Sequence, residues 1–128
     1  MVDDRKQIEE VINIFHDVNS KCPAEEILTK DFEFVDLEGQ ILTLKQMIAP
    51  SPFDNVEIHK NKIDYISRLE ISNDCNHAFI VVYVKSSGTV PKFFGPVDVD
   101  IFSIHSGYLR KVEKKWKIAF LQQSSRKI

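Results

Sequence analysis

Cysteine, glycine and long hydrophobic runs are scarce in this sequence. It holds 2 cysteines and 4 glycines among 128 residues. The two distant cysteines, Cys22 and Cys75, form no disulfide framework, which indicates reduced thiols in a cytoplasmic protein. So few glycines leave no glycine-rich phosphate loop. No apolar run approaches the roughly 20 residues that span a bilayer, and the first residues lack an apolar signal core, so no membrane association is expected.

The charges of the chain are nearly balanced. There are 17 Lys and Arg against 19 Asp and Glu, for a net charge of -2. Nucleic-acid binding needs a concentrated basic surface, so nucleic acid is not an expected partner. The four histidines, His16, His59, His77 and His105, show no metal-ligand spacing, and no metal or other cofactor is expected. The length of 128 residues suits a single domain, residues 1–128, and the hydrophobic content of 43% is ordinary for a globular protein. A chain of this length can bury a core without disulfides or a structural metal.

The first predicted helix is strongly amphipathic. Its apolar face consists of Ile8, Val11, Ile12, Phe15 and Val18. Asp4 and Gln7 form a capping-box pattern at its start, and the pattern fades near Asn19. A helix is therefore expected near the beginning of the chain.

Two shorter helices are predicted around a short strand. A proline suits the first position of a helix over residues 23–28. Residues 32–35 alternate apolar and polar side chains as a strand does. After a turn, Thr43 and Gln46 form another capping-box pattern, which predicts a third helix over 44–49.

Long strands are predicted for the second half of the chain. Four are expected, over 56–71, 78–84, 97–112 and 116–121. The first changes the parity of its apolar residues between Ile58 and Ile63, which implies a bulge. The second is a nearly continuous apolar run, typical of a strand covered on both faces. Gly107 marks a bulge in the third. Helices grouped on one side of an antiparallel sheet give an α+β fold.

Three segments carry a resemblance to a known family. They are residues 31–43, with the strand and turn, the closing hairpin over 108–118, and the ending over 122–125. In this order they resemble the nuclear transport factor two-like superfamily, and within it the SnoaL-like group. The resemblance covers nearly the whole chain.

This resemblance implies a cystatin-like fold, in which a curved antiparallel sheet wraps around three N-terminal helices and forms a cone with an internal pocket. It also implies a homodimer that pairs through the outer face of the sheet. The pocket is an active site in ketosteroid isomerase, scytalone dehydratase and polyketide cyclases. In the association domain of the calcium/calmodulin-dependent kinase, by contrast, the fold serves assembly. The fold alone therefore does not select a function.

Asp36 is the first catalytic candidate. It follows the short strand, where the ketosteroid isomerase pattern places its base, and a carboxylate enclosed in a pocket can move protons at carbon. That pattern also has a tyrosine on the first helix as an oxyanion donor, whereas this helix offers Ile12 and Phe15. Asp36 also suits a turn, because an Asp side chain readily bonds the backbone that follows it, and we favour this interpretation.

The sheet supplies further candidates. His105 and Tyr65 share the parity of apolar neighbours and, with Asp36, would make a dehydratase-like acid–base set. The simpler interpretation is that both are half-buried sheet residues with satisfied polar tips. The residues expected to bind a ligand in the cone are Phe15, Phe34, Tyr65, Phe102, Phe120 and Gln122.

Two charged features favour simple interpretations. Asp98 and Asp100 share one strand face, and such a pair is more often a solvated face than a site with interacting carboxylates. The closing hairpin is rich in Lys and Arg, which could meet an acidic partner but also discourage edge-to-edge pairing of strands.

The leading expectation is a homodimeric protein that binds a small apolar or amphipathic molecule. One alternative is an isomerase or dehydratase that uses Asp36, Tyr65 and His105. The other is an association module whose cone is filled by large side chains, among them Phe15, Phe34, Phe102, Phe120 and Trp116.

Overall fold

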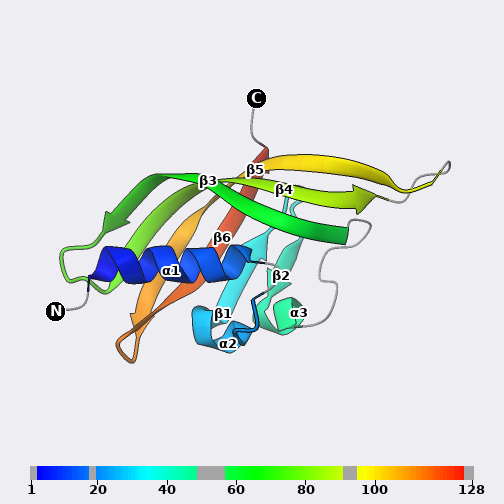
Figure 1. Ribbon diagram of the computed structural model, residues 1–128. Coiled ribbons are helices and arrows are strands. Elements are labelled where there is room, and N and C mark those ends of the chain that lie inside the picture. The colour runs from blue at the N-terminus through cyan, green and yellow to red at the C-terminus, as the bar shows by residue number, and fades with distance from the viewer. Residues whose placement is uncertain (1–2, 18–19, 49–56, 91–94, 126–128) are drawn as a thin grey trace.

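A computed structural model describes residues 3–17, 20–48, 57–90 and 95–125. These residues form one curved sheet with a long helix on its concave side (Figure 1). The elements are α1 (Asp4–His16), α2 (Ala24–Ile27), β1 (Leu28–Val35), β2 (Ile41–Thr43), α3 (Leu44–Ile48), β3 (Glu57–Ile71), β4 (His77–Val90), β5 (Val97–Val112) and β6 (Lys115–Ser125). The strand order is β2-β1-β6-β5-β4-β3, with β1 parallel to β6 and the other neighbours antiparallel.

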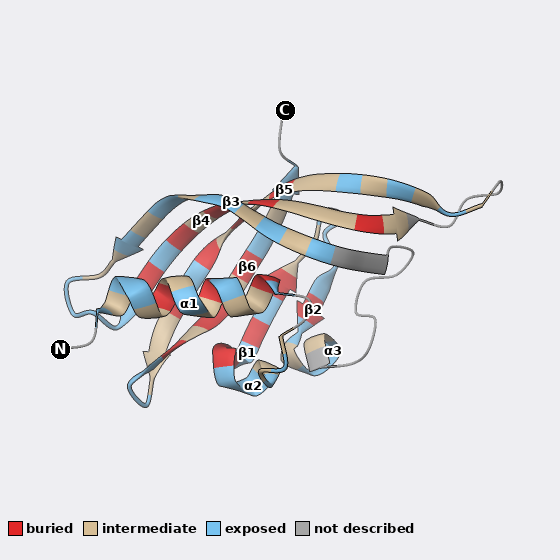
Figure 2. Cartoon of the chain, viewed as in Figure 1, coloured by how far each residue is buried: buried red, intermediate tan, exposed pale blue. Residues whose placement is uncertain are grey.

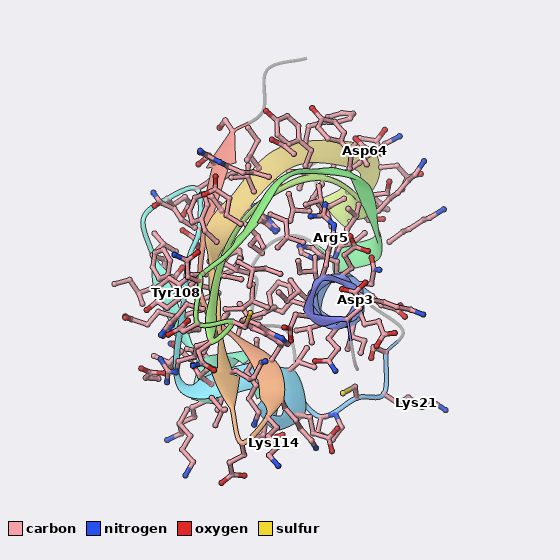
Figure 3. All side chains as sticks on the ribbon, turned by 90° about the vertical axis from the view of Figure 1, so that its left-hand side faces the viewer. Asp3, Arg5, Lys21, Asp64, Tyr108 and Lys114 are labelled. Atoms are coloured by element: carbon pink, nitrogen blue, oxygen red, sulfur yellow. The ribbon has the colours of Figure 1, made fainter. Side chains whose placement is uncertain are left out.

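The α+β class is confirmed, and α1 is the helix that the sheet curves around. Viewed along its axis, α1 lies within the curve of the strands (Figure 3). The helices α2 and α3 have four and five residues and lie beside β1 and β2 at one end of the sheet. We call the side of the sheet that faces α1 the inner face, and the opposite side the outer face.

The inner face carries the core. Every second residue of the first half of β4 is buried, namely Ala78, Ile80, Val82 and Val84, and Figure 2 shows this alternation along the strands. The helix α1 covers them with Ile8 and Ile12, which are fully buried. Phe79, which points the other way, is 39% exposed. The prediction that this strand is covered on both faces is therefore wrong for a single chain, because α1 covers only the inner face.

The helix starts differ slightly from the sequence predictions. Asp3 rather than Asp4 caps α1, because its side chain accepts the N–H of Arg5 at 3.0 Å. The helix ends at His16, and the expected end near Asn19 lies outside the described residues. At α3 the capping pattern is confirmed, since the Gln46 side chain accepts the Thr43 N–H at 2.8 Å.

The strand β1 is longer than predicted. Leu28, expected in a helix, starts the strand and pairs with Ile118 of β6. The partner strand is distant in sequence, so the local pattern could not reveal this pairing.

Bulges in β3 reset which side chains face inward. One register shift, between Ile58 and Lys60, agrees with the predicted parity change. Two more lie between Ile63 and Tyr65 and between Ile66 and Arg68. Each shift reverses the alternation of the residues that follow it. As a result, Tyr65 does not lie on the same face of the sheet as Ile63.

Gly107 lies beside a bulge rather than forming one. The extra residue belongs to β6, because Tyr108 pairs with Phe120 whereas the next residue of β5 pairs with Ile118. A Cβ atom on Gly107 would lie 1.9 Å from the Phe120 carbonyl oxygen. Only glycine allows the two backbones to approach this closely.

The basic closing hairpin is tied into the fold. Asp4 at the start of α1 accepts the Trp116 indole N–H at 2.9 Å and pairs with Lys111 at 3.0 Å. Arg110 forms two hydrogen bonds to Asp31, at 2.6 and 3.2 Å. These contacts fix the N-terminal end of α1 and the edge of β1 to the hairpin.

Candidate functional site

Two buried histidines meet between α1 and β5. His16 occupies the last turn of the helix and is 4% exposed, while His105 on the inner face of β5 is 6% exposed. The distance from His16 Nε2 to His105 Nδ1 is 2.8 Å. On the far sides, His16 Nδ1 lies 2.9 Å from the Ile12 carbonyl oxygen, and His105 Nε2 lies 3.3 Å from Ser103 Oγ. We call His16 and His105 the histidine pair.

The acceptor at one end sets the direction of these hydrogen bonds. The Ile12 carbonyl only accepts, so His16 Nδ1–H donates to it, and Nε2 of the neutral ring is an acceptor. His105 Nδ1–H therefore donates to His16, which leaves its own Nε2 to accept the Ser103 hydroxyl. The result is one continuous chain of three hydrogen bonds. Among the described residues, no buried side-chain nitrogen or oxygen lacks a partner.

Burial keeps both imidazoles uncharged at neutral pH. It lowers the pKa of His16 to about 4, partly opposed by the Ile12 carbonyl. Burial, together with the charge that His16 would carry, lowers the pKa of His105 to about 3. The histidine pair is thus a neutral, hydrogen-bonded contact between the helix and the sheet.

Aromatic rings enclose the histidine pair. Phe34 of β1 meets the His105 ring edge-on, with ring centres 5.5 Å apart, and Phe15 meets His16 at 5.0 Å. Phe15 also packs against Phe34 and Phe32, at 6.4 and 6.1 Å. Two of the residues predicted to bind a ligand, Phe15 and Phe34, therefore pack beside the histidine pair, Phe34 buried and Phe15 partly buried.

The structure places the other predicted ligand residues on the outer face. Tyr65 is 51% exposed and stacks on Tyr83 at 4.6 Å between ring centres. Phe120 stacks on Tyr108 at 6.1 Å. Phe102 lies under the Lys85 ammonium, and Gln122 pairs with Ser106 on the same face. The expectation that Tyr65 and Gln122 point into the cone with His105 is therefore corrected; the bulges of β3 explain the position of Tyr65.

Asp36 forms the turn between β1 and β2. Its Oδ1 accepts the backbone N–H groups of Glu38 and Gln40, both at 2.9 Å. Gly39 completes the turn with φ of +81°, a conformation that suits glycine. This geometry agrees with the turn interpretation of Asp36, and the structure does not assemble Asp36, Tyr65 and His105 as one acid–base set.

Sequence reasoning missed His16 as a site residue. The signal was present, because His16 follows Ile8 and Ile12 at four-residue intervals and so lies on the apolar face of the helix. Ser103 likewise shares the strand parity of His105. Polar residues at buried positions need hydrogen-bond partners, so His16 and Ser103 could both have been predicted as partners of His105.

Two surface hollows lie apart from the histidine pair. One, of about 330 Å³, is lined by Ser87, Gly88, Asp98, Val99 and Asp100. The other, of about 260 Å³, is lined by Gln7, Glu10, Val11, Glu26, Lys114, Lys115 and Trp116. In the first, Asp98 and Asp100 accept hydrogen bonds from the hydroxyls of Thr89 and Ser87.

The described part of the chain offers no group of three or more His, Cys, Asp or Glu side chains placed to hold a metal. None of its helices combines the length and the apolar character that crossing a membrane requires.

The curved sheet around a single long helix is the nuclear transport factor 2 (NTF2)-like fold, as the sequence resemblance predicted. The chain belongs to the family described as "Protein of unknown function (DUF3804)", whose model matches residues 3–128. No curated protein matches the chain.

Several solved structures share the fold. An NTF2-like protein of unknown function from Prochlorococcus has 20% sequence identity and a TM-score of 0.82, covering 99% of this chain and 96% of its own. An NTF2-like protein from Cytophaga hutchinsonii has 14% identity and a TM-score of 0.74, covering 98% and 100%. A protein from Exiguobacterium sibiricum, described as a "putative ca/calmodulin-dependent kinase ii association domain", has 14% identity and a TM-score of 0.67, covering 100% and 97%.

Proposed function

We propose that this protein is an association module whose copies pair through the outer face of the sheet. The observation that carries the proposal is a group of exposed aromatic side chains on that face. Tyr65, Phe79 and Tyr108 are 51%, 39% and 45% exposed and come from β3, β4 and β5. Phe79 and Tyr108 are direct neighbours in register.

The surroundings of these rings resemble an interface more than an ordinary surface. Phe120 and Tyr83 stack against the exposed tyrosines and extend the apolar area across four strands. Arg68 lies over the Phe79 ring at 5.8 Å. An aromatic centre with a charged rim is the usual composition of a protein interface, and a two-fold pairing lets one patch meet its own copy.

The interior favours association over chemistry. Phe15, Phe32 and Phe34 pack together beside the histidine pair, and the polar groups there are satisfied by one another. The likeness to a protein described as an association domain supports the same choice. A cytoplasmic location remains a prediction from the sequence.

Binding of a small apolar or amphipathic molecule is the second candidate. It is supported by the chain of hydrogen bonds from Ser103 to His16, which lies among aromatic rings. An amphipathic ligand there would contact both polar groups and apolar rings. A thermal-shift screen of such molecules would test it. A true interior ligand should lose its stabilising effect in Phe34→Ala, and its effect on Tyr108→Glu should be unchanged.

Sedimentation equilibrium tests the association directly. Tyr108→Glu would place a carboxylate at the centre of the proposed interface and should weaken self-association at least 100-fold, because a buried unpaired charge is strongly unfavourable. Leu37→Glu is the matched control, since Leu37 is also exposed, at 47%, but lies in the turn between β1 and β2. Equal weakening by both substitutions, or a wild-type protein that stays monomeric, would contradict the proposal.

A further inference from the structure

The two ends of α1 are held by different chemistry. At its N-terminal end, Asp4 accepts a hydrogen bond from Trp116 and pairs with Lys111. At its C-terminal end, His16 is joined to His105 of β5 by one hydrogen bond of 2.8 Å. Between these ends, Ile8 and Ile12 supply apolar burial that does not depend on pH.

The histidine pair can bind one proton without losing a bond, but not two. A proton on the pair reverses the His105 tautomer, so that His16 Nε2–H donates to His105 Nδ1, and His105 Nε2–H donates to Ser103. A second proton would put a hydrogen on both His16 Nε2 and His105 Nδ1, which lie 2.8 Å apart, so that neither nitrogen could accept from the other. The first proton is also unfavourable, because the rings are buried.

The groups of the neighbouring elements that hydrogen-bond to the pair or pack on its rings are uncharged, among them the Ile12 carbonyl and the Ser103 hydroxyl. Phe15 of α1 and Phe34 of β1 contact the rings. Val82 of β4 and Gln123 of β6 flank His105 in register. The acidic residue nearest in sequence, Asp17, is exposed at the end of α1. A charged pair inside the fold would therefore lack a counter-ion within this group.

We propose that the histidine pair is a pH-sensitive latch, which holds the C-terminal end of α1 on β5 at neutral pH and releases it near about pH 5. Release gives each imidazole access to water and hence its ordinary affinity for protons. The contact of Asp4 at the other end persists at this pH, because hydrogen bonds from Trp116 and Lys111 lower the pKa of Asp4 below its usual 3.8. The helix should therefore open from one end and uncover Phe15 and Phe34.

The size of the effect follows from proton binding. An imidazole released with a pKa of about 6.5 shifts the opening equilibrium about 30-fold between pH 7.5 and pH 5, and two imidazoles shift it about 1,000-fold. The helix amides should report this shift, because they exchange only when the helix opens.

The experiment is amide hydrogen exchange at pH 7.5 and pH 5, corrected for the intrinsic effect of pH. The opening equilibrium of residues 12–16 should rise about 1,000-fold and exceed that of residues 78–84 at pH 5 at least tenfold. His105→Gln keeps a donor for His16 but removes one titrating group, so the rise should fall to about 30-fold. His77→Gln, which removes an exposed histidine of β4, should leave the full rise.

Three results would overturn the latch. One is a rise below tenfold in the wild-type protein, and another is an equal loss of the rise in His77→Gln. The third is exchange at residues 12–16 that never exceeds exchange at residues 78–84, which would show that acid acts only through global unfolding. Should His105→Gln fail to fold, the ring ¹⁵N shifts of the wild-type protein decide: His16 and His105 must be uncharged at pH 7.5 and must gain protons over the same pH range in which exchange at residues 12–16 rises, and rings that stay uncharged while that exchange rises would overturn the latch.

Discussion

The two faces of the sheet are built from the same strands and have opposite character. On β4, Ile80 is fully buried on the inner face, while its neighbour Phe79 is 39% exposed on the outer face. On β5, His105 is enclosed and hydrogen-bonded, while Tyr108 is 45% exposed. The inner face is thus complete within one chain, and the outer face is not.

This difference shows where function is to be sought. The inner face contains the polar groups that suggest chemistry, yet they satisfy one another and secure α1. The outer face contains apolar rings that none of the described residues covers, and this feature is the basis for proposing a partner. Changes of pH or sequence that act on one face alone test this difference between the two faces.

Acidification should have the largest effect on the inner face. The folded pKa values of about 4 for His16 and about 3 for His105 lie below the unfolded value, so the unfolded chain binds more protons below pH 6.5. Stability is thus present above about pH 6.5 and is lost as the pH falls toward these values; the loss by pH 5 should be about 4 kcal/mol. Asp31, whose pKa the Arg110 guanidinium and Thr29 lower to about 2, contributes stability that is lost only at lower pH.

Urea unfolding at pH 7.5 and pH 5, at one protein concentration, measures this loss. His105→Gln should reduce it by about half, because one of the two titrating rings is removed. Equal stability of the wild-type protein at the two pH values would mean that the histidine pair is not buried and neutral.

Truncation on the two faces of β4 should differ in size. Ile80→Ala removes fully buried methylenes from the core and should cost about 3 kcal/mol of folding free energy. Phe79→Ala should cost about 1 kcal/mol of folding free energy in the dilute chain, because its ring is already partly in water. Urea titrations at submicromolar concentration would measure both. Similar costs would mean that the outer face is covered within one chain.

Gly107→Ala tests the close approach of β5 and β6. The added methyl meets the Phe120 carbonyl oxygen at 1.9 Å, so one backbone must move, which should cost about 2 kcal/mol. Ser106→Ala, one residue earlier and on the outer face, should stay within about 0.5 kcal/mol of the wild-type protein. Thermal denaturation of both variants compares them, and a neutral Gly107→Ala would refute the described register.

The smallest expected effect is a gain at the closing hairpin, away from both faces. Lys114 has a φ of +70°, which a lysine adopts at a cost. Lys114→Gly should remove that cost and stabilise the protein by about 1 kcal/mol. Lys115→Gly, in the adjacent strand position, should destabilise it. Chemical denaturation distinguishes the two, and a loss in both variants would contradict the turn geometry.

The sequence predicted those parts of the fold that depend on local pattern. The apolar spacing of the first helix and the capping pair Thr43 and Gln46 are properties of neighbouring residues, and the structure contains both. The extent of β1 was missed, because it depends on pairing with β6. The face of Tyr65 was missed for a similar reason, since the bulges of β3 depend on its register with β4.

The site was less predictable than the fold. His105 was a candidate, but its partner His16 lies 89 residues away in sequence, and no local pattern joins them. Asp36 was a candidate because of a resemblance, and its turn bonds are the outcome that its residue type favours. Long-range contacts decide a site, and a single sequence carries little information about them.

Hydroxyl-radical footprinting against protein concentration tests most directly whether a second copy covers the outer face. If copies pair through the outer face, labelling of Tyr65, Phe79 and Tyr108 should fall together as the concentration rises from nanomolar to high micromolar. Labelling of Leu37, which is exposed away from that face, should stay constant. Constant labelling of the three aromatic residues across the whole range would rule out pairing through the outer face.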